Sequence, residues 1–295
     1  MTGNSSLPLH WHEDPALFSE ATNFTASQTG FAARLIEKDY FCSLILALLA
    51  TAGPNPLVFK GGTCLSKVYA GFYRLSEDLD FAVPLETDSS RGERRRQGIL
   101  LKETVAAMLA RAPCFLQAEP LSGQNESRQY LGSVTYRSLL NNQDETIRIE
   151  ISLREPLLLP VYNGLPQTLL RHPVSGRPAE TVPIPCLAQL EAWAEKFRAT
   201  LSRPDVAVRD FFDIDFAHRK QLLPLNDPQF LDFVRRKLAV PGNAPVTINP
   251  ECLTILRRQR EARLKPVLRA QDYREFDLDR AFAIVTEMAR RLEQA

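Results

Sequence analysis

The spacing of hydrophobic residues changes several times along the chain, and each change predicts a different element. Residues 31–50 contain neither glycine nor proline and place apolar side chains at helical intervals, so we expect a buried helix there. The following text, TAGPNP, ends that helix because proline cannot continue it. A short strand at 57–59 then leads into two glycines. Residues 65, 68, 69 and 72 form the apolar stripe of the next helix, and we expect the Thr63 hydroxyl to cap it.

Alternation with a period of two predicts strands at 79–83, 131–138 and 146–154, with a helix at 93–111 between the first two. Residues 1–28 have no clear pattern, and we expect an irregular arm that begins to pack near Phe18. A proline-rich segment follows the strands and argues against a central strand or a long helix there, with prolines at 156, 160, 166, 173, 178, 183 and 185.

Beyond the prolines every patterned stretch is helical, at 186–201, 206–220, 228–238, 252–263 and 278–293. The chain therefore belongs to the α+β class. We place an α+β domain at 1–182 and an α-helical C-terminal domain at 183–295. A length of 295 residues is sufficient for two such domains.

Composition excludes several classes of protein. The chain has 36 Lys and Arg against 35 Asp and Glu, a net charge of +1, which excludes a uniformly cationic nucleic-acid binder. No apolar run approaches the ~20 residues of a membrane span, so we expect no membrane association. The first twenty residues lack a basic start followed by an apolar stretch, and the 5 cysteines are scattered without a CxxC pair. Reduced thiols and a cytoplasmic location are the simplest interpretation.

Positive charge is nevertheless concentrated in two segments. Residues 91–111 and residues 251–270 each carry six basic and two acidic side chains. Such runs are usually solvated helix faces, but two of them in a nearly neutral chain also fit contact with a polyanion such as RNA. Both interpretations stay open at this point.

The candidate chemistry starts with two aspartates on one strand. Alternation places Asp78 and Asp80 on one face of the strand and apolar residues on the other. The two carboxylates lie about 7 Å apart at ~3.3 Å per residue, and such a pair suits a hard divalent cation, Mg²⁺ or Mn²⁺. Glu150 lies on the polar side of a later strand and is expected to complete a metal-binding trio. The alternatives are a solvated strand edge for the aspartates and, for Glu150, an ion pair with Arg148 or with an arginine on a neighbouring strand.

Gly61 and Gly62 join the preceding strand to a helix and are expected to bind phosphate. Without side chains they let phosphate oxygens approach the main chain at the start of a helix. A tight strand-to-helix turn without a ligand is the alternative. Lys60, Thr63, Ser66 and Lys67 surround the glycines in the sequence and complete the predicted nucleotide-binding set. For Lys60, a side chain that points into solvent is the alternative.

The text KGGTCLSKVY followed by YRLSEDLDF resembles the signature of the AbiEii group of toxins, which have the nucleotidyltransferase fold and are relatives of DNA polymerase β-like transferases. The text 37–40, EKDY, and the downstream AEKFRATLSR and VRDFFDID are also similar to that group, so the resemblance covers about residues 30–220. It implies an N-terminal nucleotidyltransferase domain with a mixed sheet flanked by helices, an NTP donor, Mg²⁺ and a separately encoded antitoxin. One small departure is Cys64, where other small residues also fit.

The resemblance also assigns roles in the helical domain. It implies that Lys196 binds triphosphate across an interdomain cleft, together with Arg209, and that Asp210 is a functional acid. From the residues alone, a lysine on a helix is usually just solvated, and an acid in a first turn complements the helix dipole. Asp213 follows Asp210 by one turn on the same side and is the second choice for the functional acid.

We therefore expect a metal-dependent toxin that transfers a nucleoside monophosphate from an NTP to an RNA acceptor and releases pyrophosphate. The resemblance makes the 3′ end of tRNA the preferred acceptor. Catalytic roles go to Asp78, Asp80, Glu150, Lys196 and Asp210. Alternatives are transfer to a protein hydroxyl, transfer of the γ-phosphate as in a kinase, and a non-catalytic nucleotide or RNA binder.

Overall fold

The computed structural model describes residues 9–52, 56–86, 88–154 and 156–294. The chain forms two compact units. Unit 1 comprises Met1–Leu157 and Val161–Cys186, and unit 2 comprises Leu158–Pro160 and Leu187–Ala295. No helix in the described part of the chain combines the length and the hydrophobicity needed to cross a bilayer.

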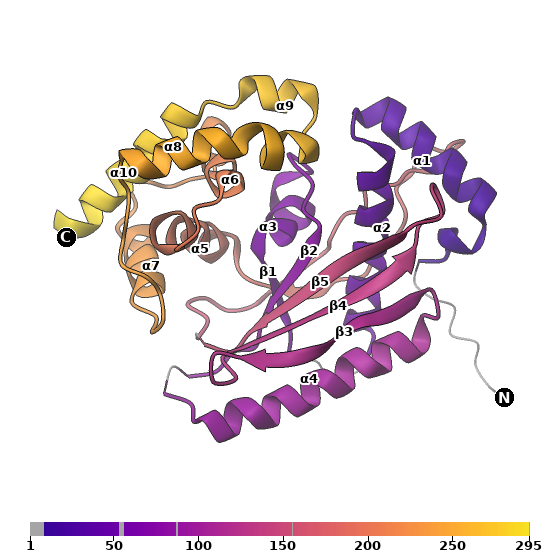
Figure 1. Cartoon of the computed structure of the whole chain (residues 1–295), viewed down its shortest axis with the longest axis horizontal. Helices are drawn as coiled ribbons and strands as arrows, with labels where there is room; N and C mark the ends of the chain where they lie inside the picture. The colour runs from indigo at the N-terminus through magenta and orange to yellow at the C-terminus, as the bar shows by residue number, and fades with distance from the viewer. Residues whose placement is uncertain (1–8, 53–55, 87, 155, 295) are drawn as a thin grey trace. The chain divides into compact units, whose positions relative to one another are not determined.

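Unit 1 is built around a mixed seven-stranded sheet with the order β3-β4-β5-β2-β1-β7-β6. Figure 1 labels the strands β1 to β5 of this sheet. β2 lies between β1, which is antiparallel to it, and β5, which is parallel to it. The strands are β1 (Val58–Lys60), β2 (Asp78–Ala82), β3 (Phe115–Gln124), β4 (Gln129–Arg137), β5 (Asp144–Ser152), β6 (Tyr162–Gly164) and β7 (Ile184–Cys186). The helices are η1 (Trp11–Glu13), α1 (Pro15–Thr29), α2 (Ala33–Ala50), α3 (Gly61–Cys64), η2 (Leu65–Ala70) and α4 (Arg91–Arg111). This is the α+β architecture that the sequence predicts.

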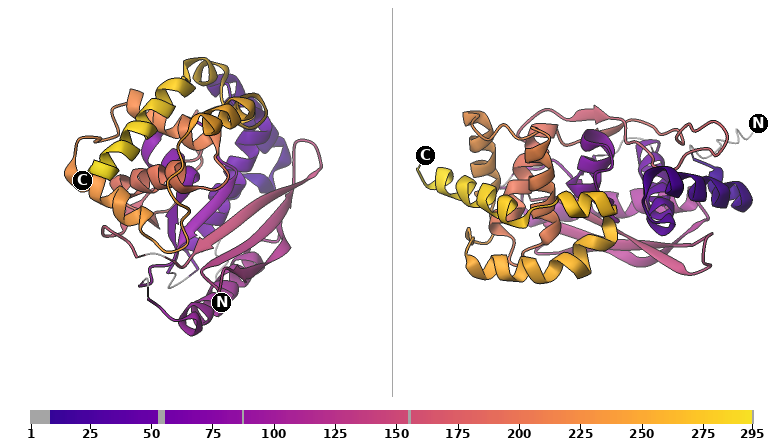
Figure 2. Two further views of the ribbon diagram at one scale, coloured as in Figure 1. Left: turned by 60° about the vertical axis from the view of Figure 1, so that its left-hand side comes forward. Right: turned by 90° about the horizontal axis from the view of Figure 1, so that it is seen from above.

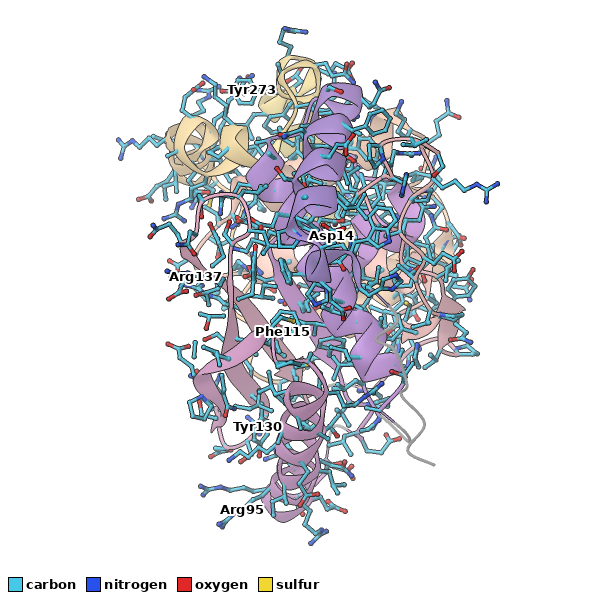
Figure 3. The ribbon with its side chains drawn as sticks, turned by 90° about the vertical axis from the view of Figure 1, so that its right-hand side faces the viewer. Asp14, Arg95, Phe115, Tyr130, Arg137 and Tyr273 are labelled. Atoms are coloured by element: carbon cyan, nitrogen blue, oxygen red, sulfur yellow. The ribbon has the colours of Figure 1, made fainter. Side chains whose placement is uncertain are left out.

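One face of the sheet is apolar and packs against α2 and α4. Alternation along β2 buries Leu79 and Phe81 and leaves the two aspartates half-buried on the other face. On the apolar side, the ring of Phe41 in α2 stacks on Tyr136 in β4, with centroids 3.9 Å apart. Tyr130 lies on the side of the sheet next to α4 (Figure 3). α2 and α4 therefore cover the apolar face, and the opposite, polar face carries the candidate chemistry.

The N-terminal arm is helical, contrary to the expectation for residues 1–28. The Asp14 side chain accepts hydrogen bonds from the amides of Ala16 and Leu17, both at 3.1 Å, and so caps α1. Proline at the first helical position and Gly30 at φ 75° after the last complete the helix. Phe18 is buried, as expected. Residues 1–8 of this prediction lie outside the described part of the chain.

The proline-rich segment contains an internal strand, which the prolines had argued against. β7 lies between β1 and β6 and includes Pro185. It is only three residues long, and its register partners are Phe59 for Cys186 on one side and Asn163 for Pro185 on the other. So short a pairing is compatible with one missing amide donor.

The regular elements of unit 2 are all helices in its described part, as predicted. It contains α5 (Gln189–Ser202), α6 (Val208–Arg219), α7 (Pro228–Leu238), α8 (Pro250–Gln259), η3 (Arg260–Leu264), η4 (Lys265–Val267), α9 (Ala270–Glu275) and α10 (Leu278–Gln294). Aromatic pairs join the helices: Phe197 of α5 meets Phe230 of α7, and Phe211 of α6 stacks on Phe282 of α10. Figure 2 gives two further views of these helices.

Candidate functional site

Three acidic residues occupy adjacent positions on the polar face of the sheet. Asp78 and Asp80 lie on β2, and the parallel register places Glu150 of β5 directly beside Asp80. On the opposite side, the antiparallel register places Lys60 of β1 beside Asp80. Neighbouring strands are about 4.8 Å apart, so residues paired in register share one face at close range. The structure thus places the three acids at neighbouring register positions of β2 and β5, and their role as a metal-binding trio stays a prediction.

Glu150 is oriented by a residue that the sequence did not suggest. The amide of Gln129, at the start of β4, donates a hydrogen bond of 2.7 Å to Oε1 of Glu150. Among the described residues Glu150 makes no ion pair, so the alternative of a pair with Arg148 is wrong; in the register, Arg148 lies beside Asp78. The role of Gln129 could have been predicted only from the pairing register of β4 and β5, which the sequence pattern does not give.

The two glycines pack tightly against charged side chains. Gly61 has φ +78°, and a Cβ built on it would lie 2.8 Å from Cγ and 2.9 Å from Cβ of Asp80. A Cβ on Gly62 would overlap the guanidinium of Arg74, which is buried. Glycine is therefore required at Gly61 both by the backbone conformation and by the carboxylate beside it. The turn and the aspartate strand form one closely packed group.

The hydroxyls that follow the glycines bind the main chain of unit 1. Thr63 donates a hydrogen bond of 2.5 Å to the carbonyl of Asp78, and Ser66 donates one of 2.7 Å to the carbonyl of Arg74. The prediction that Thr63 caps the helix is wrong, because α3 already begins at Gly61. Both hydroxyls fix the turn to the segment that leads into β2, and this positions Asp78 and Asp80.

Lys67 lies away from the glycines, in a buried ion pair with α2. Its ammonium is 2.5 Å from Oδ1 of Asp39 and 2.8 Å from the hydroxyl of Ser43, and only 1% of its side chain is exposed. Asp39 also accepts a hydrogen bond from the amide of Leu169. Phosphate could reach Lys67 only by replacing these partners. We therefore leave Lys67 out of the proposed nucleotide site.

Two further residues of the EKDY segment have structural contacts as well. Glu37 accepts hydrogen bonds of 2.7 Å from the Ser138 hydroxyl and the Leu139 amide, and burial raises its pKa above the ordinary value. Lys38 pairs with Glu77 at 3.2 Å. Both side chains thus attach α2 to other parts of unit 1.

The fit of the acids to a metal ion rests on their chemistry and their register. Among the described residues, no three His, Cys, Asp or Glu side chains are already close enough to share one ion. Mg²⁺ in transferases commonly takes one or two carboxylates and completes its coordination with substrate phosphates. Asp78 and Asp80 on one strand face, with Glu150 in register, supply hard oxygen donors of that kind. The donor set fits a divalent cation that arrives with a nucleotide.

In unit 2, the predicted lysine and aspartates form one buried cluster. The ammonium of Lys196 is 2.7 Å from Asp210 and 2.9 Å from Asp213, and all three side chains are at most 9% exposed. Arg203 adds a second cation, 2.7 Å from Asp210. Both candidates for the functional acid therefore bind the same lysine. Arg209 precedes Asp210 and is half-buried.

Comparisons with known proteins identify the family and the fold of the chain. A family model described as "Nucleotidyl transferase AbiEii toxin, Type IV TA system" matches residues 44–283. The crystal structure of a candidate nucleotidyltransferase from H. pylori is similar, with a TM-score of 0.50 and 17% identity over 90% of this chain and 98% of that chain. JHP933 from Helicobacter pylori has a TM-score of 0.46 and 16% identity over 90% of this chain and 95% of that one. No curated protein sequence matches the chain.

Proposed function

Because this chain belongs to the AbiEii family of nucleotidyl transferase toxins of type IV toxin–antitoxin systems, we propose that it transfers a nucleoside monophosphate from an NTP to an RNA hydroxyl. The oxygen of the acceptor hydroxyl forms a bond with the α-phosphorus. The bond from that phosphorus to the β-phosphate oxygen breaks, and pyrophosphate leaves with the electron pair.

One observation carries this proposal: the glycine turn packs against Asp80, and Asp80 lies in register with Glu150. The register sets Glu150 beside Asp80, and Gly61 lies against the Asp80 carboxylate. A triphosphate held by the main chain of the turn, through its β- and γ-phosphates, would thus meet the acids directly. Glu150 has Oε1 bound by Gln129, which leaves Oε2 to take the proton of the acceptor hydroxyl.

The proposal includes a divalent cation, Mg²⁺ or Mn²⁺, held by Asp78 and Asp80 with Glu150. When bound, such an ion would neutralise charge on the triphosphate and on the leaving pyrophosphate. The residues of the turn have a different task, which is to fix the aspartates. Thr63 does so through the Asp78 carbonyl, and Gly61 does so by direct contact with Asp80.

For the acceptor and the partner we propose the 3′ end of tRNA and a cognate antitoxin. A nucleotide added to the tRNA end would block aminoacylation and so stop growth, and a separately encoded protein would neutralise the toxin. The family description supports an antitoxin, since it names a type IV toxin–antitoxin system. In unit 2, we propose that Lys196, Arg209 and the aspartates of the buried cluster support nucleotide binding.

The proposal is tested with each of the four α-labelled NTPs, total cellular RNA and Mg²⁺. We expect the label to enter tRNA, and Asp80→Asn to abolish the transfer. Asp144→Asn is the matched control, because Asp144 lies on β5 with Glu150 but its side chain is 68% exposed. It should transfer label as the wild type does.

Each other outcome contradicts a defined part of the proposal. Normal labelling by Asp80→Asn would end the assignment of the catalytic acids. Label in protein would replace the RNA acceptor by a protein hydroxyl, and label from γ-labelled but not α-labelled ATP would indicate a kinase. Tight NTP binding without pyrophosphate release would indicate a non-catalytic binder.

A further inference from the structure

A pocket of about 540 Å³ opens in unit 2, within the second of the two basic segments and the helices that follow it. All of its lining residues come from η3, α9, α10 and their surroundings, between positions 257 and 280. Four of them are arginines, at positions 257, 260, 274 and 280, and three are acids, at positions 275, 277 and 279. The charge that the pocket offers to a ligand therefore depends on which of these side chains already form ion pairs.

The three acids of the pocket are each paired with an arginine. Asp279 lies 2.7 Å from Arg257, and Asp277 lies 3.8 Å from Arg280. Glu275 lies 2.7 Å from Arg219, which is outside the pocket. Arg219 and Arg280 also pair with buried Asp215, at 3.1 and 2.6 Å, so these pairs offset only part of the negative charge.

Two of the four arginines that line the pocket, Arg260 and Arg274, make no ion pair with a described residue. Arg260 instead lies over two aromatic rings, 4.9 Å from the centroid of Tyr273 and 5.7 Å from that of Phe276, and its buried Nε has no hydrogen-bond acceptor. Tyr273 is labelled at the upper end of Figure 3. Asp277 and Glu261 are near enough to feel the charge of Arg260 but lie beyond ion-pair distance. A guanidinium held against rings with no carboxylate in direct contact is prepared to accept an anion.

We propose that this pocket binds a phosphate group of the RNA strand that receives the nucleotide. The planar guanidinium of Arg260 matches the geometry of a phosphate, and Arg274 supplies a second cation. Exposed Arg258 and Arg263 extend the positive charge beyond the pocket, which favours a strand with several phosphates over a single small anion. This inference rests on the proposed function, because it names where the acceptor of that reaction is held.

The test measures binding without turnover. A fluorescein-labelled tRNA is titrated with the full-length protein in the absence of NTP, and anisotropy is recorded at several salt concentrations. We expect Arg260→Gln and Arg274→Gln each to weaken binding about tenfold, as for the loss of one charged hydrogen bond. The slope of log K against log salt should fall by about one for each variant.

The control variant is Arg290→Gln, which also removes one positive charge from unit 2. Arg290 pairs with Glu287 at 2.7 Å and does not line the pocket, so RNA affinity should not change. Arg260→Gln loses its ring contacts and is checked by thermal unfolding. Arg274 is exposed and has no such ring contact, so Arg274→Gln keeps the test valid if Arg260→Gln unfolds.

The outcomes separate this inference from the proposed function. If the wild type binds RNA and both pocket variants bind equally well, the inference is wrong and the proposed function stands. An equal loss with Arg290→Gln would also contradict it, since the effect would then follow total charge. If excess NTP displaces RNA from the wild type but not from Arg274→Gln, the pocket is a nucleotide site instead. Absence of RNA binding by the wild type would overturn both the RNA acceptor and this inference.

Discussion

Replacement of Gly61 by alanine tests the contact between the glycine turn and Asp80. The new methyl carbon would lie 2.8 Å from Cγ and 2.9 Å from Cβ of the aspartate. Both distances are well below the sum of the van der Waals radii of two carbon atoms, so the groups would overlap. Because the nearest atoms include Cβ of Asp80, a rotation of the carboxylate group alone cannot remove the overlap with the new methyl group. Asp80 must rotate, or the turn must shift.

The magnitude follows from two separate terms. Alanine at φ +78° costs about 1–2 kcal/mol of stability, because L-residues with a Cβ are strained in the left-handed region. Forcing Asp80 off its rotamer adds about 0.5–1.5 kcal/mol. Activity should suffer more, because displacement of a catalytic group by about 1 Å can cost on the order of a hundredfold in rate.

Gly71 provides the matched control. It has φ +66°, and a Cβ there would meet nothing within 4 Å. Gly71→Ala therefore carries the backbone penalty without the steric one. Urea unfolding measures the stability of both variants, and release of pyrophosphate from NTP in the presence of RNA measures their activity.

We expect Gly61→Ala to lose about a hundredfold in kcat/KM, while Gly71→Ala keeps its activity at a similar loss of stability. Equal activities of the two alanine variants would refute the reasoning, since the contact between the turn and Asp80 would then have no part in the chemistry. This holds whether both variants keep their activity or both lose it; in the second case backbone strain, which the two share, would account for the loss.

Three other variants test the buried charges. Lys67→Met should lower the free energy of unfolding by about 3–5 kcal/mol in urea titrations, because it leaves the Asp39 carboxylate buried without its cation, yet leave KM for NTP unchanged in the folded protein. Lys196→Met should destabilise the protein by about 3 kcal/mol for the same reason, with Arg203 still compensating part of the charge; wild-type stability would contradict the buried cluster. Burial raises the pKa of Glu37 above its ordinary value of 4.5, so the folded state binds this proton more tightly. Its contribution to stability is full below pH 4.5 and is lost as the pH rises through the raised value; chemical denaturation from pH 4 to 8 should show this fall in the wild type and not in Glu37→Gln.

The sequence predicted the strand faces well because alternation is a local signal. Buried Leu79 and Phe81 follow directly from a period of two, and so does the position of Asp78 and Asp80 on the opposite face. That Glu150 lies beside Asp80 depends on a parallel register between distant strands, which no local pattern encodes.

Other features depend on partners far away in the chain. Lys67 occupies the polar side of its helix in the sequence, but its partner Asp39 lies on α2 and turns it into a buried residue. β3 includes Pro120 and Gly123, which disfavour a strand, and it forms through its long antiparallel pairing with β4. The helix α1 is different, since its signals, Asp14 followed by proline and a terminal glycine, are visible in the sequence.

The place of β7 in the sheet has a consequence for synthesis of the protein. β1 is complete at Lys60, but its parallel neighbour ends at Cys186, so one side of β1 stays unpaired while the intervening chain leaves the ribosome. At about 5–20 residues per second, this interval lasts roughly 6–25 seconds. During that time the strand that leads into the glycine turn is an open edge, a form of backbone prone to pair with other chains. A nascent chain that stops before Ile184 would keep this edge open.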